Sequence, residues 1–229
     1  MTRIVYKTPD FLVIYKPAGV PSQSDKTGDA DAMTITADIL RSMGEDDSLF
    51  LIHRLDRVVG GLMLFARNKK YAALLSSMVA EREFKKEYLA VAEGEMTDGQ
   101  LVDYIYKDSI LNRAVISSKS HSGAKRAELE YKVLDKAEVN GRRVSLLLVE
   151  LKTGRFHQIR AQLSSRGHSL LGDKKYGNKD SGCRFPALFA AGLSFEIGNK
   201  NNVIRELPDT DSYPWSLFSK EKYEEINNL

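Results

Sequence analysis

The chain has 229 residues, of which 42% are hydrophobic, and this is enough to bury a core in one domain or in one large and one small domain. No apolar run approaches the roughly 20 residues of a membrane-spanning helix, and the N-terminus resembles neither a signal peptide nor a transit helix. A single cysteine, Cys183, excludes an intrachain disulfide framework and a cysteine-based zinc cluster. We therefore expect a cytoplasmic protein.

The net charge of +3 is distributed unevenly along the chain. Residues 25–47 contain seven acids and two bases, and residues 205–229 contain six acids and three bases, whereas residues 150–180 contain seven bases and three acids. A concentrated basic segment is typical of proteins that bind a polyanion. A solvated charged surface explains the same pattern, so charge alone leaves both interpretations open.

The order of predicted elements favours strands in the middle of the chain. Helical spacing of apolar residues predicts helices over 32–43 and 156–165, a helix to about residue 83 with Asn68 as its N-cap, and a terminal amphipathic helix within 208–229. Apolar alternation and turn signals predict strands over 3–7, 11–15, 49–52, 61–66, 86–92, 101–106, 113–118, 126–134 and 143–151. Because neighbouring strands follow one another without strict βαβ alternation, we expect an α+β fold with a mixed, mostly antiparallel central sheet and flanking helices. One domain over residues 1–229 is the economical interpretation.

The stretch LIHRLDRVVGGLMLFARNKK places a carboxylate in the corner between two apolar strands. Asp56 lies there, close in sequence to Arg54 and Arg57, and we expect it to be ionised at neutral pH. An ionised carboxylate can act as a nucleophile or hold a charge, but it cannot act as a general acid. Taken by itself, the pattern favours the simpler interpretation of a salt-bridged turn.

The stretch LKTGRFHQIRAQLSSRGHSLLGDKKYG places Arg155 at a second corner, where a strong strand ends and a helix begins. His157, Arg160 and Ser164 fall on one helix face, opposite the apolar stripe. A basic face at a helix N-terminus suits an anion, because free N–H groups and side-chain charge act together. Surface cations on an ordinary amphipathic helix remain the alternative.

Other site chemistries find little support. The four histidines form no HxH or HExxH pattern, so the sequence predicts no metal site. The GxSxG pattern of serine hydrolases and the glycine patterns of nucleotide-binding loops are absent.

The ordered set of motifs resembles the RluA-type pseudouridine synthase family. The motifs that carry this resemblance, from residue 3 to residue 193, are VIYKPAGVPSQS, HRLD followed by GGLMLFAR, KKEYLAVAEG, TGRFHQIRAQL and GHSLLGDKKYG. HRLD alone would be a weak signal, whereas five motifs in the family's order are specific. The resemblance implies isomerisation of uridine to pseudouridine in structured RNA, without a cofactor and with the target base flipped out of its helix.

The resemblance also implies roles for individual residues. Asp56 corresponds to the family's catalytic aspartate, Tyr88 to its active-site tyrosine, and Arg155 to the basic partner of the aspartate. Arg54 resembles the residue that fills the space left by the flipped base, and Leu170 or Leu171 is expected to pack in the pocket. The remaining residues expected to contact RNA are His53, His157, Arg160, Lys85 and Lys86. Whether Asp56 attacks C1′ or C6, or assists removal of the C2′ proton, stays open.

The sequence departs from the family pattern at a few places. Val58 and Val59 stand where many members carry Thr-Ser, and Ser169 stands where proline is common. Because the catalytic pattern begins at once, we expect no N-terminal S4 domain and a compact target such as a stem-loop of rRNA or tRNA. No long apolar stripe stands out, which favours a monomer. An RNA-binding protein without turnover and a structural protein with a buried ion pair are the competing hypotheses.

Overall fold

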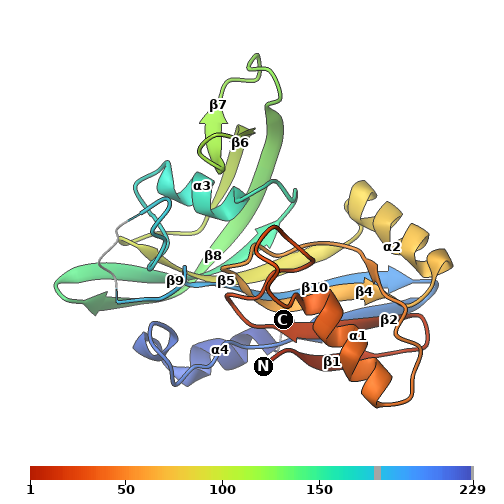
Figure 1. The fold of residues 1–229 in the computed structure, drawn as a ribbon. Helices are drawn as coiled ribbons and strands as arrows, with labels where there is room; N and C mark the ends of the chain where they lie inside the picture. The colour runs from red at the N-terminus through yellow and green to blue at the C-terminus, as the bar shows by residue number, and fades with distance from the viewer. Residues whose placement is uncertain (178–181, 228–229) are drawn as a thin grey trace. The chain divides into compact units, whose positions relative to one another are not determined.

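The computed structural model describes residues 1–177 and 182–227 and divides the chain into two compact units, each assembled from two segments of sequence (Figure 1). Unit 1 comprises Met1–Lys85 and Ala190–Glu206, and unit 2 comprises Lys86–Phe189 and Leu207–Leu229. Whether the chain acts as the one catalytic domain expected above remains a prediction. Among the described residues, no helix is both long and apolar enough to cross a lipid bilayer.

Unit 1 is a sheet with one helix against each face. Its strands follow the order β1-β2-β4-β10, with β3 paired to β4 and β11 paired to β10. The strands are β1 (Arg3–Lys7), β2 (Phe11–Lys16), β3 (Phe50–Leu51), β4 (Gly60–Ala66), β10 (Leu188–Ile197) and β11 (Lys200–Arg205), and the helices are α1 (Ala32–Ser42) and α2 (Lys69–Glu81).

Alternation along β2 and β4 explains why both faces of this sheet are covered. Phe11 and Val13 point into a core that contains Leu75 and Met78 of α2. Leu12 and Ile14 point into a second core with Ala32 and Leu40 of α1. Successive side chains of a strand face opposite sides, so an almost wholly apolar strand such as FLVIYK needs a cover on each side.

Side-chain caps fix where the two helices of unit 1 begin. The Asp31 carboxylate accepts hydrogen bonds from the backbone N–H groups of Met33 and Thr34, at 2.9 and 3.0 Å. The Asn68 side chain accepts one from the N–H of Tyr71, at 2.9 Å, which confirms the predicted cap. Each cap satisfies donors that the first helical turn leaves without an intrahelical partner.

Unit 2 is an antiparallel sheet in the order β5-β9-β8-β6-β7. Its strands are β5 (Lys85–Glu93), β6 (Gly99–Asp108), β7 (Arg113–Ser117), β8 (Lys125–Val139) and β9 (Arg142–Leu151). The helix α3 (Gln158–Ser164) packs on β6, β7 and β8, and Ala161 joins the small core of Ile105, Ala114 and Ala127. The short helix η1 (Trp215–Leu217) and α4 (Lys220–Asn227) come from the second segment of the unit.

The predicted α+β class with a mostly antiparallel sheet is confirmed, while two strands were missed. The sequence analysis assigned no element to residues 188–205, where β10 and β11 lie. The first part of β10 is buried throughout, so it shows no alternation between apolar and polar residues. Ala190, Ala191 and Gly192 also lower its intrinsic strand signal.

Candidate active site

Asp56 lies in the loop between β3 and β4, and its neighbours on both sides are bonded to the KPAGVPS loop that follows β2. The Ser22 hydroxyl donates to the Leu55 carbonyl at 2.7 Å and accepts from the Leu55 N–H at 3.1 Å. The Gly19 N–H donates to the Arg57 carbonyl at 2.7 Å. The backbone at positions 55 and 57 is therefore fixed by a second loop, so the partly buried Asp56 between them has a defined position.

Lys16 is a buried lysine whose amine interacts electrostatically with this carboxylate. Its side chain is fully excluded from solvent, and its Nζ donates to the carbonyls of Val20 at 2.8 Å and Pro17 at 3.1 Å. Burial lowers the pKa of Lys16 from 10.5 to about 7, although the charge of Asp56 opposes this shift. Its Nζ also donates to the Arg57 carbonyl at 3.4 Å, so Lys16 joins the two loops.

The two arginines that flank Asp56 in sequence differ in their surroundings. Arg57 turns toward the segment that follows β2, where its Nε donates to the Gly19 carbonyl at 3.0 Å and its guanidinium pairs with Asp25 and Asp29. Arg54 is exposed. Of the pair, Arg54 therefore has the accessibility that a residue contacting RNA requires.

His53 is held inside unit 1. Its Nε2 accepts the N–H of Leu64 at 3.2 Å, and its ring centroid lies 5.8 Å from that of Phe84. This hydrogen bond attaches the start of the HRLD loop to β4.

Gly61, which follows the HRLD motif, is required for steric reasons. Gly61 has a φ of +119°, and a Cβ at this position would lie 2.3 Å from the Ala190 carbonyl oxygen. Only glycine lets β4 approach β10 this closely. The departure from the Thr-Ser pattern at Val58 and Val59 leaves this requirement intact.

Tyr88 lies on β5 in unit 2 and is buried, with Val149 of β9 as its partner across the ladder. Side-chain alternation places Lys86 on the same face as Tyr88 and Glu87 on the other. A Cβ on Gly154 would lie 3.2 Å from the Lys86 Nζ, so this ammonium lies against the turn that carries Arg155. Burial lowers the pKa of Lys86. The neighbouring Lys85 is exposed.

Arg155 lies in a turn after β9 that buried polar side chains stabilise. The Gln158 Oε1 accepts the Arg155 N–H at 2.9 Å and the Thr153 hydroxyl at 2.8 Å. The Gln158 Nε2 donates to the Glu128 carbonyl at 3.0 Å, which anchors the turn to β8. The Arg155 side chain itself donates from Nε to the Arg126 carbonyl at 2.9 Å.

His157 precedes α3 with a left-handed backbone, at φ +49°, and its ring is enclosed by two other rings. It stacks on Phe156 at 3.8 Å between centroids, and its Nδ1 lies 2.8 Å from the Tyr176 hydroxyl. Burial, reinforced by the charges of Arg160 and Lys175, lowers the pKa of His157 to about 3. The imidazole is therefore neutral at physiological pH and adds no positive charge for a phosphate.

Arg160 does not lie on an exposed basic face, as the helical pattern indicated. Its side chain is only 5% exposed and forms a two-point ion pair with Asp173, at 2.7 and 2.8 Å. Its guanidinium also lies 5.1 Å from the ring centroid of Tyr176. The helical pattern indicated the wrong side because β6, β7 and β8 cover one face of α3 while residues 173–176 cover the other.

Leu170 and Leu171 are both buried in unit 2 and lie beside β5. Leu170 forms a bridge with Ala92, and the Leu171 N–H donates to the Val91 carbonyl at 2.9 Å. Ser169, in the same segment, donates from its hydroxyl to the Glu93 carboxylate at 3.1 Å. This serine thus has a polar partner that a proline at this position would lack.

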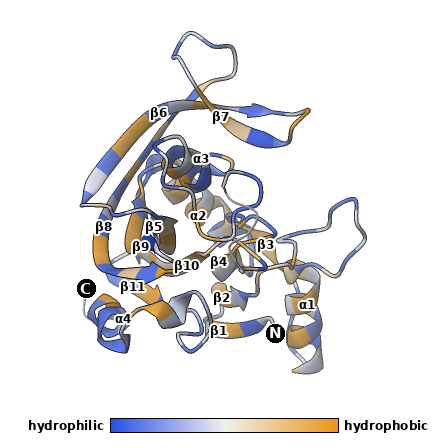
Figure 2. Cartoon of the chain, turned by 90° about the vertical axis from the view of Figure 1, so that its left-hand side faces the viewer, coloured by the Kyte–Doolittle hydropathy of each residue, from blue (hydrophilic) through white to orange (hydrophobic). Residues whose placement is uncertain are grey.

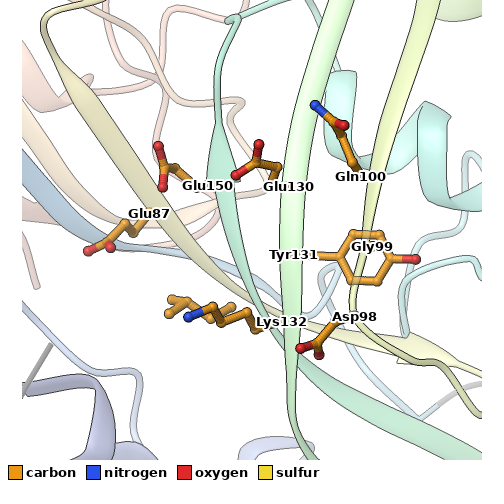
Figure 3. A pocket seen from close by; sticks show the side chains of 9 residues that line it. Glu87, Asp98, Gly99, Gln100, Glu130, Tyr131, Lys132 and Glu150 are labelled. Atoms are coloured by element: carbon orange, nitrogen blue, oxygen red, sulfur yellow. The ribbon is translucent and has the colours of Figure 1, made fainter.

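A cavity of about 540 Å³ lies on the sheet face of unit 2 toward which Glu87 points, opposite to Tyr88 (Figure 3). Glu87, Glu150 and Glu130 form a row across three paired strands there. The complete lining is Glu87, Asp98, Gly99, Gln100, Glu130, Tyr131, Lys132, Leu148 and Glu150. Four acids against one lysine repel phosphates, so this cavity is not suited to RNA.

Three polar residues that stabilise the site loops, Lys16, Thr153 and Gln158, were not singled out from the sequence. Each lies inside a motif that was identified, KPAGVPSQS for the first and TGRFHQIR for the others. In the sequence, each is only a polar residue near the end of a strand or the start of a helix. Its structural role depends on its being buried, which the sequence pattern does not show. Among the residues that the structure describes, no three His, Cys, Asp or Glu side chains are grouped to hold a metal ion.

Comparison with known proteins gives one consistent family. The family model for RNA pseudouridylate synthases matches residues 10–165. The tRNA pseudouridine synthase C of Haemophilus ducreyi is 34% identical over 185 residues, which cover 76% of this chain and 74% of that protein. The ribosomal large subunit pseudouridine synthase D of Zymomonas mobilis is 30% identical over 180 residues, covering 76% and 55%. The chain spans little more than half the length of several such relatives.

The solved structures agree on the fold. Human RNA pseudouridylate synthase domain containing 1 superposes with a TM-score of 0.77 at 23% identity, covering 100% of this chain and 95% of that one. Human RNA pseudouridylate synthase domain containing 4 gives a TM-score of 0.72 at 21% identity, covering 90% and 88%. At this level of identity the likeness shows a shared fold.

Proposed function

Because the chain belongs to the RNA pseudouridylate synthase family, we propose that it isomerises specific uridines to pseudouridine in rRNA or tRNA, with Asp56 as the essential carboxylate. The observation that carries the proposal is the HRLD loop, in which Ser22 and Gly19 fix the backbone on both sides of Asp56. A reaction that needs one aimed carboxylate benefits from such pre-organisation. The relatives named above, one acting on tRNA and one on the ribosomal large subunit, support the two RNA classes.

The reaction requires uracil to leave C1′, turn and rejoin C1′ through C5. The C1′–N1 bond breaks, a C1′–C5 bond forms, and the proton on C5 is lost while N1 gains one. Asp56 attacks C1′ or C6, or assists removal of the C2′ proton, and these three routes remain alternatives. No cofactor is needed for this balance, since the atoms of substrate and product are the same.

We assign supporting roles to residues of both units. Arg155 is assigned the role of the basic partner that keeps the carboxylate ionised during the reaction. Tyr88 stacks on the base, and its hydroxyl takes part in the late proton removal from C5. Leu170 and Leu171 shield the detached uracil from water, and Arg54 occupies the space that the flipped base leaves.

The RNA contacts fall into accessible and enclosed residues. Arg54 and Lys85 are exposed and are assigned to phosphates. Lys86 lies against the Arg155 turn and is assigned to the same region of the substrate. The side chains of His53, His157 and Arg160 contact other groups of the protein. We therefore assign these residues to holding the loops in place.

Tritium release from RNA labelled at C5 of uridine tests the assignment, since C5 loses its hydrogen only when the new bond forms. Wild-type protein is expected to release label from a tRNA or rRNA fraction. Asp56→Asn is expected to lower the release by at least about 10⁴-fold, because the carboxylate acts in the bond-breaking step. Asp211→Asn, at a surface ion pair with Lys220, serves as the matched control and is expected to keep full activity.

Two outcomes would contradict the proposal. RNA binding by the wild type without release from any fraction would favour a binding protein that lacks turnover. A lower melting temperature of Asp56→Asn, with turnover retained in the folded fraction, would favour a structural ion pair.

A further inference from the structure

The turn between β6 and β7 exposes two large apolar side chains. Ile110 is 95% exposed and Leu111 is 60% exposed, more than the other large apolar residues within the described chain except Met1. In Figure 2 the β6–β7 hairpin lies above α3, and the end of the hairpin is coloured orange, as hydrophobic. Burying such side chains is the ordinary way to stabilise a fold, so their exposure at this turn points to another use.

The turn is held in one shape. The Asp108 carboxylate accepts the N–H groups of Ile110 and Leu111, both at 2.9 Å. The Lys175 Nζ donates to the Asn112 carbonyl at 2.7 Å and ties the far side of the turn to residues near α3. The two apolar side chains are thus presented outward from a defined backbone.

The chain around this turn is strongly basic. Residues 107–126, here called the basic hairpin, carry five cations and one acid, a net charge of +4, so the rest of the chain sums to −1. Lys107, Lys119 and Lys125 are exposed. Such a concentration of charge complements a polyanion and is poorly matched to an apolar protein surface.

The basic hairpin also carries rings and connects to the Arg155 turn. Tyr106, just before it, stacks on His121 at 3.8 Å between centroids. The Arg113 guanidinium lies 4.7 Å from the Tyr176 ring. Arg126 accepts the Arg155 side chain on its carbonyl, so the segment ends where the proposed catalytic arginine is anchored. Rings interleaved with cations are typical of surfaces that bind unpaired nucleotides.

We propose that the basic hairpin is an RNA-contact element in which its lysines bind phosphates while Ile110 and Leu111 pack against unstacked bases. Isoleucine and leucine side chains can lie between base steps, and inserting them costs least where the bases are already unpaired and unstacked. The proposal rests on RNA being the substrate class, and it extends the contact surface beyond the residues identified from the sequence.

Binding is measured in the Asp56→Asn background, so that affinity is independent of turnover. The probes are bulk tRNA and a perfectly paired RNA duplex, titrated by fluorescence anisotropy. Ile110→Ser with Leu111→Ser is expected to weaken tRNA binding about tenfold and to leave duplex binding unchanged, because only tRNA offers unpaired bases. The two side chains are exposed, so the melting temperature is expected to stay the same.

The lysines are tested by the salt dependence of binding. Lys119→Ala with Lys125→Ala is expected to lower the slope of log affinity against log salt by about two, one for each phosphate contact. Arg142→Ala, an exposed cation at the other end of β8 and β9, is the matched control and is expected to keep the wild-type slope.

The outcomes separate this proposal from the proposed function. Equal tRNA affinity of the parent and the Ile110/Leu111 variant, or an unchanged salt slope, would overturn the RNA-contact element even if tritium release succeeds. Equal tRNA affinity of the Ile110/Leu111 variant would leave a protein partner as the occupant of the two apolar side chains. If the hairpin variants bind tRNA more weakly but the wild type releases no tritium from any fraction, the RNA-contact element is supported and only the proposed catalytic activity is contradicted.

Discussion

Lys16 is the residue at which burial and charge conflict most. A fully buried lysine is rare unless its amine is hydrogen-bonded, and here three backbone carbonyls accept from it. Its pKa of about 7 means that folding favours the neutral amine over the ammonium found in the unfolded chain. The contribution of Lys16 to the free energy of unfolding therefore depends on pH.

The pH dependence of stability should report this lysine. Since the folded pKa of about 7 is below the unfolded value of 10.5, the unfolded chain binds more protons between these values, and the contribution of Lys16 rises with pH. From pH 7 to pH 9, the stability difference between wild type and Lys16→Met is expected to shift by about 2 kcal/mol in favour of the wild type. Urea unfolding at both pH values measures it, with the exposed Lys69→Met as control. An identical difference at the two pH values would argue against a neutral Lys16.

Substitutions of Arg160 and Arg54 should have different effects, the first on the stability of the fold and the second on RNA binding. Arg160→Met leaves the Asp173 carboxylate buried without its partner and is expected to lower the free energy of unfolding by about 3 to 5 kcal/mol. Arg54→Met removes an exposed charge and is expected to change stability by less than about 0.5 kcal/mol while weakening RNA binding several-fold. Urea unfolding and RNA titration of both variants check this. Equal stability of the two variants would contradict the structural role of Arg160.

At the scale of elements, strand pairing in unit 2 brings like charges together. The register aligns Glu87 with Glu150 and Glu150 with Glu130. Like charges directly opposite each other destabilise a sheet. Lys152 offsets this row, because its Nζ bonds Glu150 at 2.5 Å and pairs with Glu130 at 3.2 Å. These two carboxylates raise the pKa of Lys152.

Removing this lysine should make the stability of unit 2 depend on salt. Lys152→Met is expected to lower the free energy of unfolding by about 1 kcal/mol at low ionic strength. Added salt is expected to restore much of the loss, because it screens the repulsion among the three glutamates. Thermal melts from low to high sodium chloride measure this, with the exposed Lys200→Met as control. A loss that salt does not change would mean that Lys152 acts through packing.

Elements also differ in how far their local sequence determined them. Asn68 and the stripe of α2 predicted that helix because cap and periodicity are both local. The stripe of α3 identified a helix but not the surroundings of Arg160, since a charged residue on a short helix can face solvent or a partner such as Asp173. Asp173 lies beyond the end of α3, so the periodicity of the helix gives no information about this ion pair.

At the scale of the whole molecule, each unit takes segments that are distant in sequence. The core of unit 1 combines Phe11 and Leu64 with Leu193, Phe195 and Ile204 from the second segment. The aromatic rings of Phe84 and Phe195 stack at 5.0 Å between centroids, which joins the two segments directly. Unit 1 is therefore incomplete without residues 190–206.

A fragment of residues 1–85 is expected to lack a cooperative fold. Without β10 and β11, the face of the sheet that packs on α2 loses three buried side chains and the neighbour of β4. Circular dichroism during urea titration checks this, and a chain that links residues 1–85 to 190–206 by a flexible glycine-serine linker is the control. Cooperative unfolding of 1–85 alone would contradict the interleaved organisation.

The sequence by itself determined the family, most of the elements and the loop that carries Asp56, because motifs, periodicity and caps are properties of neighbouring residues. It identified HRLD and TGRFHQIR, and both lie at strand ends as expected. Only the tertiary structure decided which polar residues are buried, such as Lys16 and Gln158, and which apolar ones remain exposed, such as Ile110. Burial depends on segments that are distant in sequence and meet only in the folded chain. Burial in turn determines which polar groups need hydrogen-bond partners and which pKa values shift.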